Sequence, residues 1–311
     1  MKSVQIIVST YNGHDYLPTQ LDSLLAQDVE SLGIARLNIL VRDDGSKDDT
    51  HQILEEYKKN YPGKVEWYTG PNLRSAKSFF DLMTRSTNFD YVCLCDQDDY
   101  WLPNKVSSAI KFLEHTENQD EPKLYCCRVT PVDQNLQPLA TNIPFPPPHS
   151  EFGFRNALVQ CVATGCGCVL NNQLVNLICK QLPEFTIMHD WWAYLCATAF
   201  GHFYFDENSY IKYRQHAGNV IGMKTSAISR FILRAKRYPK NRGQMYQQIV
   251  NFVSIFEKDY PDSVALSQAK QLVDAKHNLF KRIKFLAKVK PYRQEKRDNL
   301  IMTIIILLGN Y

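Results

Sequence analysis

Cys95-Asp96-Gln97-Asp98-Asp99-Tyr100-Trp101 follows directly on the apolar run Tyr91-Val92-Cys93-Leu94. The apolar run has the composition of a buried strand, so three carboxylates stand within four positions where that strand ends. A solvated turn with helix-capping aspartates explains one or two of them, but explains three poorly. Oxygen ligands suit Mg²⁺ or Mn²⁺, and Asp96 and Asp98 point the same way if the segment stays extended. We therefore expect a divalent cation at this strand end.

The chain before this stretch repeats a pattern of strand, polar turn and helix. Apolar, β-branched segments predict strands at 4–9, 37–41, 65–68 and 91–94, and helical spacing predicts helices near 16–27, 50–60 and 75–84. Such alternation implies βαβ units in a parallel sheet, with a ligand site beyond the carboxyl ends of the strands. Four polar clusters fall at those ends: Thr10-Tyr11-Asn12, Asp43-Asp44-Gly45-Ser46, residues 72–77 and residues 96–99.

The second of these clusters has two interpretations. Asp43-Asp44-Gly45-Ser46 has the composition of an Asx-turn that precedes a helix, and this explanation is sufficient for the cluster alone. Its expected place beside Tyr11 favours a pocket for a pyrimidine instead. There the carboxylate would accept a hydrogen bond from the ring N3–H, and the tyrosine would stack on the face of the base.

Charge is distributed unevenly along the 311 residues. Residues 1–211 contain 16 Lys/Arg and 26 Asp/Glu, whereas residues 212–311 contain 20 and 6. With 44% apolar and 22% charged residues, the chain is typical of a globular protein with one large α/β domain and a smaller appendage. The basic part favours an anionic partner such as lipid, nucleic acid or a phosphorylated substrate. Nucleic acid is disfavoured, because no basic motif with interleaved stacking aromatics is present.

The basic part has the pattern of amphipathic helices from about 226 to 290. Arginines and lysines gather at 230–242 and again at 281–290, where Phe280, Phe285 and Leu286 supply apolar surface. Such helices lie on anionic bilayers, although a solvated helical face has the same composition. The apolar segment 300–308 is suited to a dimer contact or to the membrane interface. We expect no leader and no segment that spans a bilayer alone, and the nine cysteines without a CxxC pair favour reduced thiols in a cytoplasmic protein.

Three motifs taken together resemble the family 2 glycosyltransferases of the GT-A fold. They are Val8-Ser9-Thr10-Tyr11-Asn12-Gly13, the segment from Arg42-Asp43-Asp44-Gly45-Ser46 to Thr50, and Cys95-Asp96-Gln97-Asp98-Asp99-Tyr100-Trp101. The resemblance covers about the first 110 residues. The Asp-Gln-Asp-Asp-aromatic-Trp form, together with Gly70-Pro71-Asn72-Leu73 and Lys77-Ser78-Phe79-Phe80, is similar to rhamnosyltransferases of bacterial cell-wall and capsular polysaccharides.

The resemblance implies an α/β fold with a Rossmann-like mixed sheet, helices on both faces and a helical C-terminal extension. It implies dTDP-L-rhamnose as the donor, with the base at Tyr11 and Asp44 and the sugar near Asp99. The residues that it assigns to donor binding are Thr10, Tyr11, Asn12, Asp44, Lys77, Asp96, Gln97, Asp99 and Arg214. One departure is Arg74, which stands where the family often has glycine after Asn-Leu, and which could reach a phosphate instead.

The same resemblance implies a metal and a general base. The cofactor would be Mn²⁺ or Mg²⁺, with Asp98 as the main ligand, assisted by Asp96 and by His216 of Tyr213-Arg214-Gln215-His216. Asp190, in His189-Asp190-Trp191-Trp192, would take the proton of the acceptor hydroxyl from the side opposite the nucleotide. Thr164-Gly165-Cys166-Gly167 is either a loop beneath the sugars or a tight turn without a ligand.

The expected activity is an inverting, metal-dependent transfer of L-rhamnose to a polyprenyl-diphosphate-linked saccharide at the inner face of the plasma membrane. We expect a GT-A catalytic domain over 1–225, with a nucleotide-sugar half to about 110 and an acceptor half over 111–225. Residues 226–311 are expected to form a basic helical region for membrane association or a homodimer contact. Two alternatives stay open: the same fold with a UDP-hexose donor, and a non-catalytic nucleotide-sugar-binding assembly protein.

Overall fold

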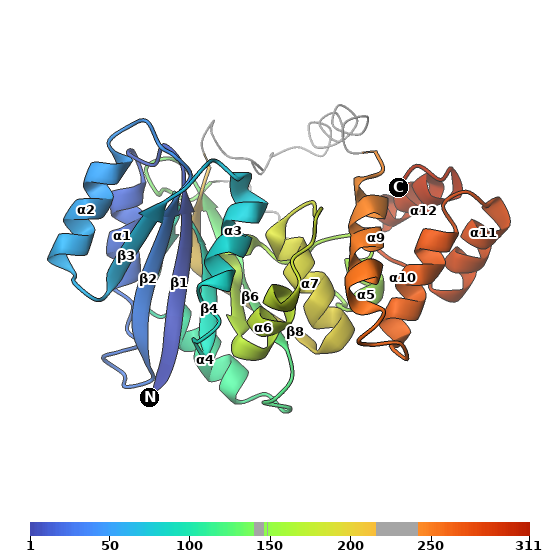
Figure 1. Cartoon of the computed structure of the whole chain (residues 1–311), viewed down its shortest axis with the longest axis horizontal. Coiled ribbons are helices and arrows are strands. Elements are labelled where there is room, and N and C mark those ends of the chain that lie inside the picture. Colours follow the sequence, from blue (N-terminus) through green and yellow to red (C-terminus); the bar gives the residue numbers. More distant parts are fainter. Residues whose placement is uncertain (140–145, 148, 216–241) are drawn as a thin grey trace.

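The structure, a computed structural model, describes residues 1–139, 146–147, 149–215 and 242–311. Within these ranges the chain is built on an eight-stranded sheet with the order β3-β2-β1-β4-β7-β6-β8-β5 (Figure 1). The strands are β1 (Lys2–Thr10), β2 (Ala35–Asp43), β3 (Val65–Thr69), β4 (Tyr91–Asp96), β5 (Tyr100–Trp101), β6 (Lys123–Val132), β7 (Cys168–Asn171) and β8 (His202–Arg214).

The first four long strands run parallel, as the alternation of segments predicts. β1 pairs in parallel with both β2 and β4, and β2 pairs in parallel with β3. The register places Thr10 opposite Asp43, and Ser9 opposite Asp96. The polar loops after β1, β2 and β4 therefore leave the sheet at the same level. β7 then enters antiparallel to both β4 and β6, so the sheet is mixed, as expected.

Helices cover both faces of the sheet because its strands alternate between two apolar cores. In β1, Val4, Ile6 and Val8 face one core, and Ile7 faces the other. The first core is closed by helices α1, α2 and α4, and the second by α3, α5, α6 and α7. The bounds of these helices are α1 (Leu17–Leu25), α2 (Thr50–Asn60), α3 (Arg74–Thr84), α4 (Lys105–Glu114), α5 (Phe154–Ala157), α6 (Asn172–Lys180) and α7 (His189–Phe200).

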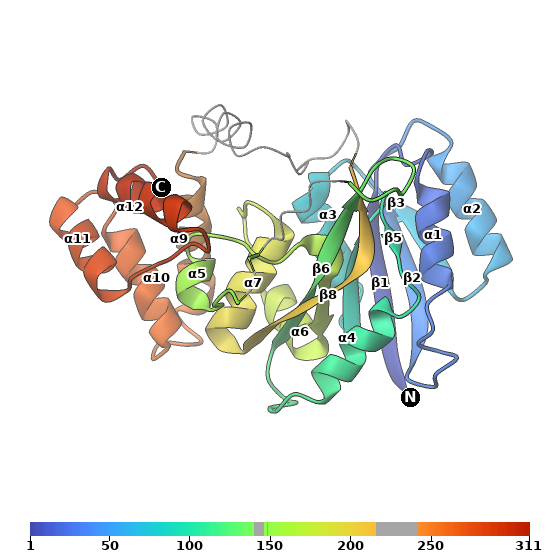
Figure 2. The ribbon, with the colours of Figure 1, turned by 180° about the vertical axis from the view of Figure 1, so that it is seen from behind.

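Four further helices extend the second core away from the sheet. They are α9 (Gln244–Phe256), α10 (Val264–Asp274), α11 (Leu279–Lys288) and α12 (Lys296–Leu307). Phe252 of α9 packs against Trp192 and Phe200 of α7, with ring centroids 5.9 and 5.7 Å apart. These helices form the end of the molecule opposite to α1 and α2, as Figures 1 and 2 show from two sides. Among the described residues, no helix has the length and apolar character needed to cross a membrane.

Candidate active site

The loop after β1 is tied to the acidic loop after β4 by one side chain. Gln97 accepts hydrogen bonds at its Oε1 from Thr10 Oγ1, at 2.6 Å, and from Tyr11 N, at 2.9 Å. Its Nε2 donates to Tyr11 O at 3.3 Å. Thr10 is buried, whereas the ring of Tyr11 is 44% exposed. The first loop is thereby fixed beside the acidic loop, with an aromatic ring available on its surface.

The same loop is held on its other side by the loop after β2. Asn12, which has a positive φ of 50°, donates from its main-chain nitrogen to Ser46 Oγ at 2.8 Å and accepts from Lys47 N at its Oδ1 at 2.9 Å. Asp43 is fully buried and accepts hydrogen bonds from Gly45 N, at 2.9 Å, and from His51 Nε2, at 2.7 Å. Asp43 therefore shapes the interior of this loop, while Asp44 faces a different set of partners.

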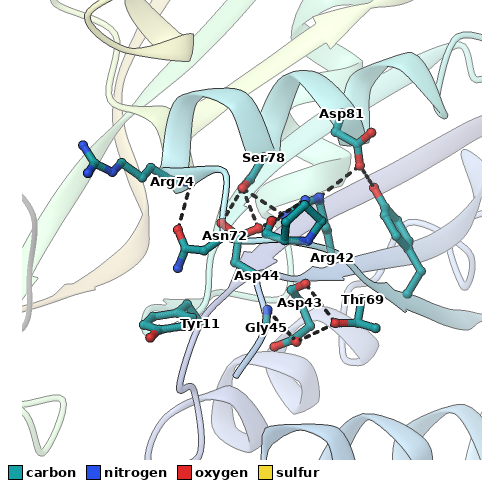
Figure 3. Close-up of polar contacts among 12 residues, drawn as sticks. Tyr11, Arg42, Asp43, Asp44, Gly45, Thr69, Asn72, Arg74, Ser78 and Asp81 are labelled. Atoms are coloured by element: carbon teal, nitrogen blue, oxygen red, sulfur yellow. Dashed lines mark hydrogen bonds and ion pairs between the residues drawn. The ribbon is translucent and has the colours of Figure 1, made fainter. Parts of the chain in front are cut away.

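Those partners form a buried network around Arg42 (Figure 3). The Arg42 guanidinium contacts the carboxylate of Asp44, donates to Asp81 Oδ2 at 3.0 Å and donates to Pro71 O at 2.9 Å. Ser78 Oγ lies 2.7 and 2.6 Å from the two carboxylate oxygens of Asp44. Arg42 is 2% exposed and Asp44 3%. The network fixes the carboxylate of Asp44 and joins it to the loop after β3 and to helix α3.

The loop after β3 ends in an unusual backbone conformation at the start of α3. Arg74, the first residue of the helix, has φ 62°, in the left-handed region that is costly for residues other than glycine. Its main-chain nitrogen donates to Asn72 Oδ1 at 3.1 Å. In Figure 3 its side chain extends away from the Arg42–Asp44 pair. Lys77 lies on the first turn of the same helix and is exposed.

The acidic loop, residues 96–99, buries carboxylates close to one another, and this raises the pKa values of two of them. Asp99 is fully buried; its Oδ1 accepts from Arg214 N at 3.1 Å, and the Cys166 thiol lies beside its carboxylate. Burial and the neighbouring charges of Asp98 and Asp96 hold the pKa of Asp99 well above its usual range. Burial and the charges of Asp98 and Asp190 raise the pKa of Asp96 to about 7. Oxygen and sulfur atoms of Asp96, Asp99 and Cys166 all lie within 4.8 Å of one another.

Arg214, at the end of β8, supports this loop from below. Its Nε donates to Asp98 O at 2.7 Å, and its NH1 donates to Gln134 O. Its guanidinium carbon lies 4.6 Å from the centre of the Tyr16 ring, and the residue is 4% exposed. In this structure Arg214 therefore positions the acidic loop, and its expected contact with a phosphate stays a prediction. His216, an expected metal ligand, lies outside the described residues.

Helix α7 brings Asp190 to the same edge of the sheet. Trp191 N donates to Asp190 Oδ1 at 2.7 Å, and Gly165 lies so close that an added Cβ would stand 3.6 Å from Asp190 Oδ2. Burial raises the pKa of Asp190 to about 6. His189 is 2% exposed and stacks on Phe79 at 3.9 Å between ring centroids, and burial lowers its pKa to about 3. His189 is thus a neutral packing residue beneath Asp190.

The structure gathers most of the expected site residues at one edge of the sheet. Thr10, Tyr11, Asn12, Asp44, Asp96, Gln97, Asp98, Asp99, Asp190 and Arg214 all lie there. No role had been predicted for Arg42, Ser78 or Cys166. An arginine at the end of a buried apolar strand was the available signal, because such a charge needs partners. No comparable signal marked Ser78 or Cys166.

Comparison with known proteins identifies this arrangement. The model of the family "Glycosyl transferase family 2" matches residues 5–170, which is more than half of the chain. The chain is 26% identical over 261 residues to the dTDP-rhamnosyl transferase RfbG of Shigella flexneri, covering 79% of this chain and 83% of that protein. It is 27% identical over 114 residues to the UDP-Glc:alpha-D-GlcNAc-diphosphoundecaprenol beta-1,3-glucosyltransferase WfaP of Escherichia coli, covering 37% of this chain and 42% of that protein.

Solved structures agree on the fold. TarS of S. aureus, residues 1–349, aligns with a TM-score of 0.57 at 16% identity, over 100% of this chain and 81% of that chain. A structure of the same protein in complex with UDP-GlcNAc aligns with a TM-score of 0.54 at 14% identity, over 93% of that chain. The GT-A fold that the three motifs implied is confirmed. The chain therefore belongs to glycosyl transferase family 2, and this membership supports a glycosyltransferase activity.

Proposed function

We propose that this glycosyltransferase moves L-rhamnose from dTDP-L-rhamnose to a lipid-linked, rhamnose-containing saccharide, with inversion at the anomeric carbon. The similarity to RfbG, which extends over most of both chains, supports the donor. The observation that carries the reaction is the meeting of Asp190 with the acidic end of β4, where its charge raises the pKa of Asp96. A nucleotide-sugar pocket with a carboxylate close by that can act as a base contains the groups that a single displacement at the anomeric carbon requires.

The donor would lie along the edge formed by the first, second and acidic loops. The exposed ring of Tyr11 offers a stacking face for the base. The Asp44 carboxylate is paired with the Arg42 guanidinium and contacts Ser78 Oγ, and a carboxylate paired in this way accepts hydrogen bonds. Because it has about four lone-pair directions, it can also accept from a pyrimidine N3–H. Further contacts with the donor are expected from Thr10, Asn12, Lys77 and Gln97.

The acidic loop fits a divalent cation. The carboxylates of Asp96 and Asp99, whose pKa values are raised, and the Cys166 thiol lie within 4.8 Å of one another. A bound cation relieves the repulsion between the two carboxylates. We propose that Asp98, Asp96 and His216 hold Mn²⁺ or Mg²⁺. When bound, the ion would offset the charge of the nucleotide diphosphate as it leaves. Arg214 keeps the loop that carries Asp98 in place.

Asp190 would act as the general base. With a pKa of about 6, its carboxylate is ionised at neutral pH and basic enough to accept a proton. The acceptor hydroxyl gives this proton to Asp190 while its oxygen bonds to the anomeric carbon, and the bond from that carbon to the diphosphate breaks. Attack from the face opposite the leaving group inverts the configuration.

A donor panel tests the proposal. The purified enzyme is offered dTDP-L-rhamnose, UDP-glucose, UDP-galactose and UDP-GlcNAc with synthetic polyprenyl-diphosphate-linked acceptors, with and without EDTA, and the products are read by mass spectrometry. A mass increase of one deoxyhexose, lost with EDTA, is the expected result. A hexose added from a UDP donor would overturn the choice of rhamnose; this second candidate is supported by the similarity to WfaP. Absence of transfer from every donor would favour a non-catalytic binding protein.

A further inference from the structure

Helix α12 turns an apolar face to solvent. Leu300, Ile304 and Leu308, four residues apart and hence on one side of the helix, are 63%, 48% and 63% exposed. The side chains that point inward include Asp298, at 7% exposed, and Ile306 at 0%. A helix on the surface of a globular protein normally buries its apolar stripe and exposes its charges. The exposed face of α12 is therefore unusual for a surface that meets only water.

The neighbouring helix α11 has an exposed apolar stripe as well. Leu279, Phe280 and Ile283 are 50%, 83% and 48% exposed, while Phe285 is buried at 1%. Phe280 therefore supplies exposed apolar surface, as its place in the sequence predicted, whereas the same prediction for Phe285 is wrong. Next to the exposed stripe lie Lys281, Lys284 and Lys288, which are spaced to share one side of the helix and are all exposed.

The two helices form one end of the molecule. Arg282 NH1 donates to Leu307 O at 2.8 Å, which joins α11 to the last turn of α12. Figures 1 and 2 show both helices at the end opposite to α1 and α2. We call Leu279, Phe280, Ile283, Leu300, Ile304 and Leu308 the apolar end surface. Single exposed apolar residues are ordinary, but six large ones on two adjoining helices indicate a surface that is covered in use.

The charge around the apolar end surface indicates what kind of partner covers it. Residues 279–311 contain eight lysines and arginines and two acidic residues. Self-association through this end would bring the same basic patch of two copies together, because a two-fold interface uses the same surface on both subunits. An anionic bilayer instead offers hydrocarbon to the apolar residues and negative headgroups to the lysines.

We propose that the apolar end surface docks the enzyme onto an anionic lipid bilayer, with the leucines and isoleucines in the interface and the lysines against the headgroups. The inference rests on the proposed function in one respect, since a lipid-linked acceptor lies at such a surface. Docking places the acceptor half of the enzyme close to the membrane that holds its substrate. The binding itself involves neither the donor nor the sugar.

Vesicle binding tests this inference with the full chain. Sedimentation with phosphatidylcholine vesicles is compared with sedimentation with vesicles that also contain phosphatidylglycerol. The wild-type enzyme is expected to bind the anionic vesicles, and added salt should weaken the binding because it screens the lysines. The double variant Ile304→Ser, Leu308→Ser should bind at least about tenfold more weakly, and Lys281→Gln, Lys284→Gln should lose about fivefold per charge.

A matched control separates the surface from general hydrophobicity. Val264, the first residue of α10, is 72% exposed and lies outside the apolar end surface, so Val264→Ser should bind as the wild type does. Melting temperatures establish that each variant is folded. The inference is overturned if the wild-type enzyme does not bind anionic vesicles, or if Val264→Ser weakens binding as much as the substitutions in the apolar end surface do. If the wild-type enzyme is a dimer in sedimentation velocity and the double variant Ile304→Ser, Leu308→Ser is a monomer, the surface serves self-association instead.

The outcome stays separable from the choice of substrate. Vesicle binding without rhamnose transfer would leave the docking surface standing and overturn the proposed donor. Transfer to a water-soluble acceptor by an enzyme that does not bind vesicles would overturn the docking surface alone. The serine variants are expected to keep full activity on the water-soluble acceptor, because none of the substituted residues borders the active site.

Discussion

Asp190 and Asp96 come from distant parts of the chain, yet the charge of Asp190 contributes to the raised pKa of Asp96, about 7. One carboxylate lies in the first turn of helix α7, and the other ends strand β4. Between them lies the Gly165–Gly167 turn, whose Gly165 is close to Asp190 and whose Cys166 adjoins Asp99. The turn therefore adjoins both the acidic loop and Asp190, an arrangement that suits the proposed role of Asp190 as the base.

Asp190→Asn should abolish most of the transfer while leaving the donor bound. Asparagine keeps the shape of the side chain but cannot accept the acceptor's proton, so kcat should fall about 10²–10⁴-fold. Donor affinity, measured by calorimetry, should be unchanged or better, because a negative charge that adds to the repulsion at the acidic loop is removed. Glu184→Gln is the matched control: this exposed residue precedes the same helix and should have no effect. Unaltered transfer by Asp190→Asn would rule out this base.

The pH dependence of transfer should follow Asp190. Burial raises its pKa to about 6, and the base works only when ionised, so kcat/KM should fall as the pH drops through about 6 and be flat above. On a logarithmic plot the acid limb has a slope of one. The measurement is initial rate against pH at saturating metal. If the residual activity of Asp190→Asn shows the same limb, another group is responsible.

Removal of Asp98 should remove the response to metal. Asp98→Asn is expected to need at least about tenfold more Mn²⁺ for half-maximal activity, since one anionic ligand is lost. The wild-type affinity for the ion should also weaken as the pH falls through about 7, because Asp96 must give up its proton to bind. Titration of EDTA-treated enzyme with Mn²⁺ at several pH values checks both. Full activity of the wild type in EDTA would contradict the proposed metal.

Arg42→Ala should destabilise the fold substantially. The substitution leaves the buried carboxylate of Asp44 without its cation and Asp81 without its partner at 3.0 Å. Breaking such a buried pair costs about 3–5 kcal/mol of unfolding free energy, measurable by urea denaturation. Arg85→Ala is the comparison, because Arg85 lies 3.7 Å from the same Asp81 but is 54% exposed, and its loss should cost about 0–1 kcal/mol. If both substitutions lower the free energy of unfolding equally, the buried pairs of Arg42 contribute no more stability than the exposed pair of Arg85.

Local patterns in the sequence predict the fold well over the first four strands. Each strand is an apolar, β-branched run and each helix has its own amphipathic spacing, so the elements are readable one at a time. The position of Asp96 and Asp44 at one edge follows from parallel pairing. Their pairing with Asp190 does not follow, because it depends on how α7 packs under the Gly165–Gly167 turn, a contact between distant segments that no local pattern records.

The Arg42 network and the exposed face of α12 could not be predicted from the sequence, for a similar reason. Arg42 was part of a motif, but three of its four partners, Pro71, Ser78 and Asp81, come from the loop after β3 and from helix α3. In α12 the apolar residues are abundant on every side, so periodicity does not indicate which of them face outward. Ile306 is buried and Ile304 is not, and only the packing on α11 decides between them.

The Gln97 bridge joins the loop after β1 to the acidic loop through groups that carry no charge. Its amide joins Thr10 and Tyr11 to the acidic loop, and neither an amide nor a hydroxyl gains or loses a proton near neutrality. In the proposed reaction a cation and a diphosphate would arrive at this edge and leave it in every cycle, and the local electrostatic field would change each time. Because the Gln97 bridge is uncharged, it would hold through those changes and keep the loop after β1 in place for the next donor.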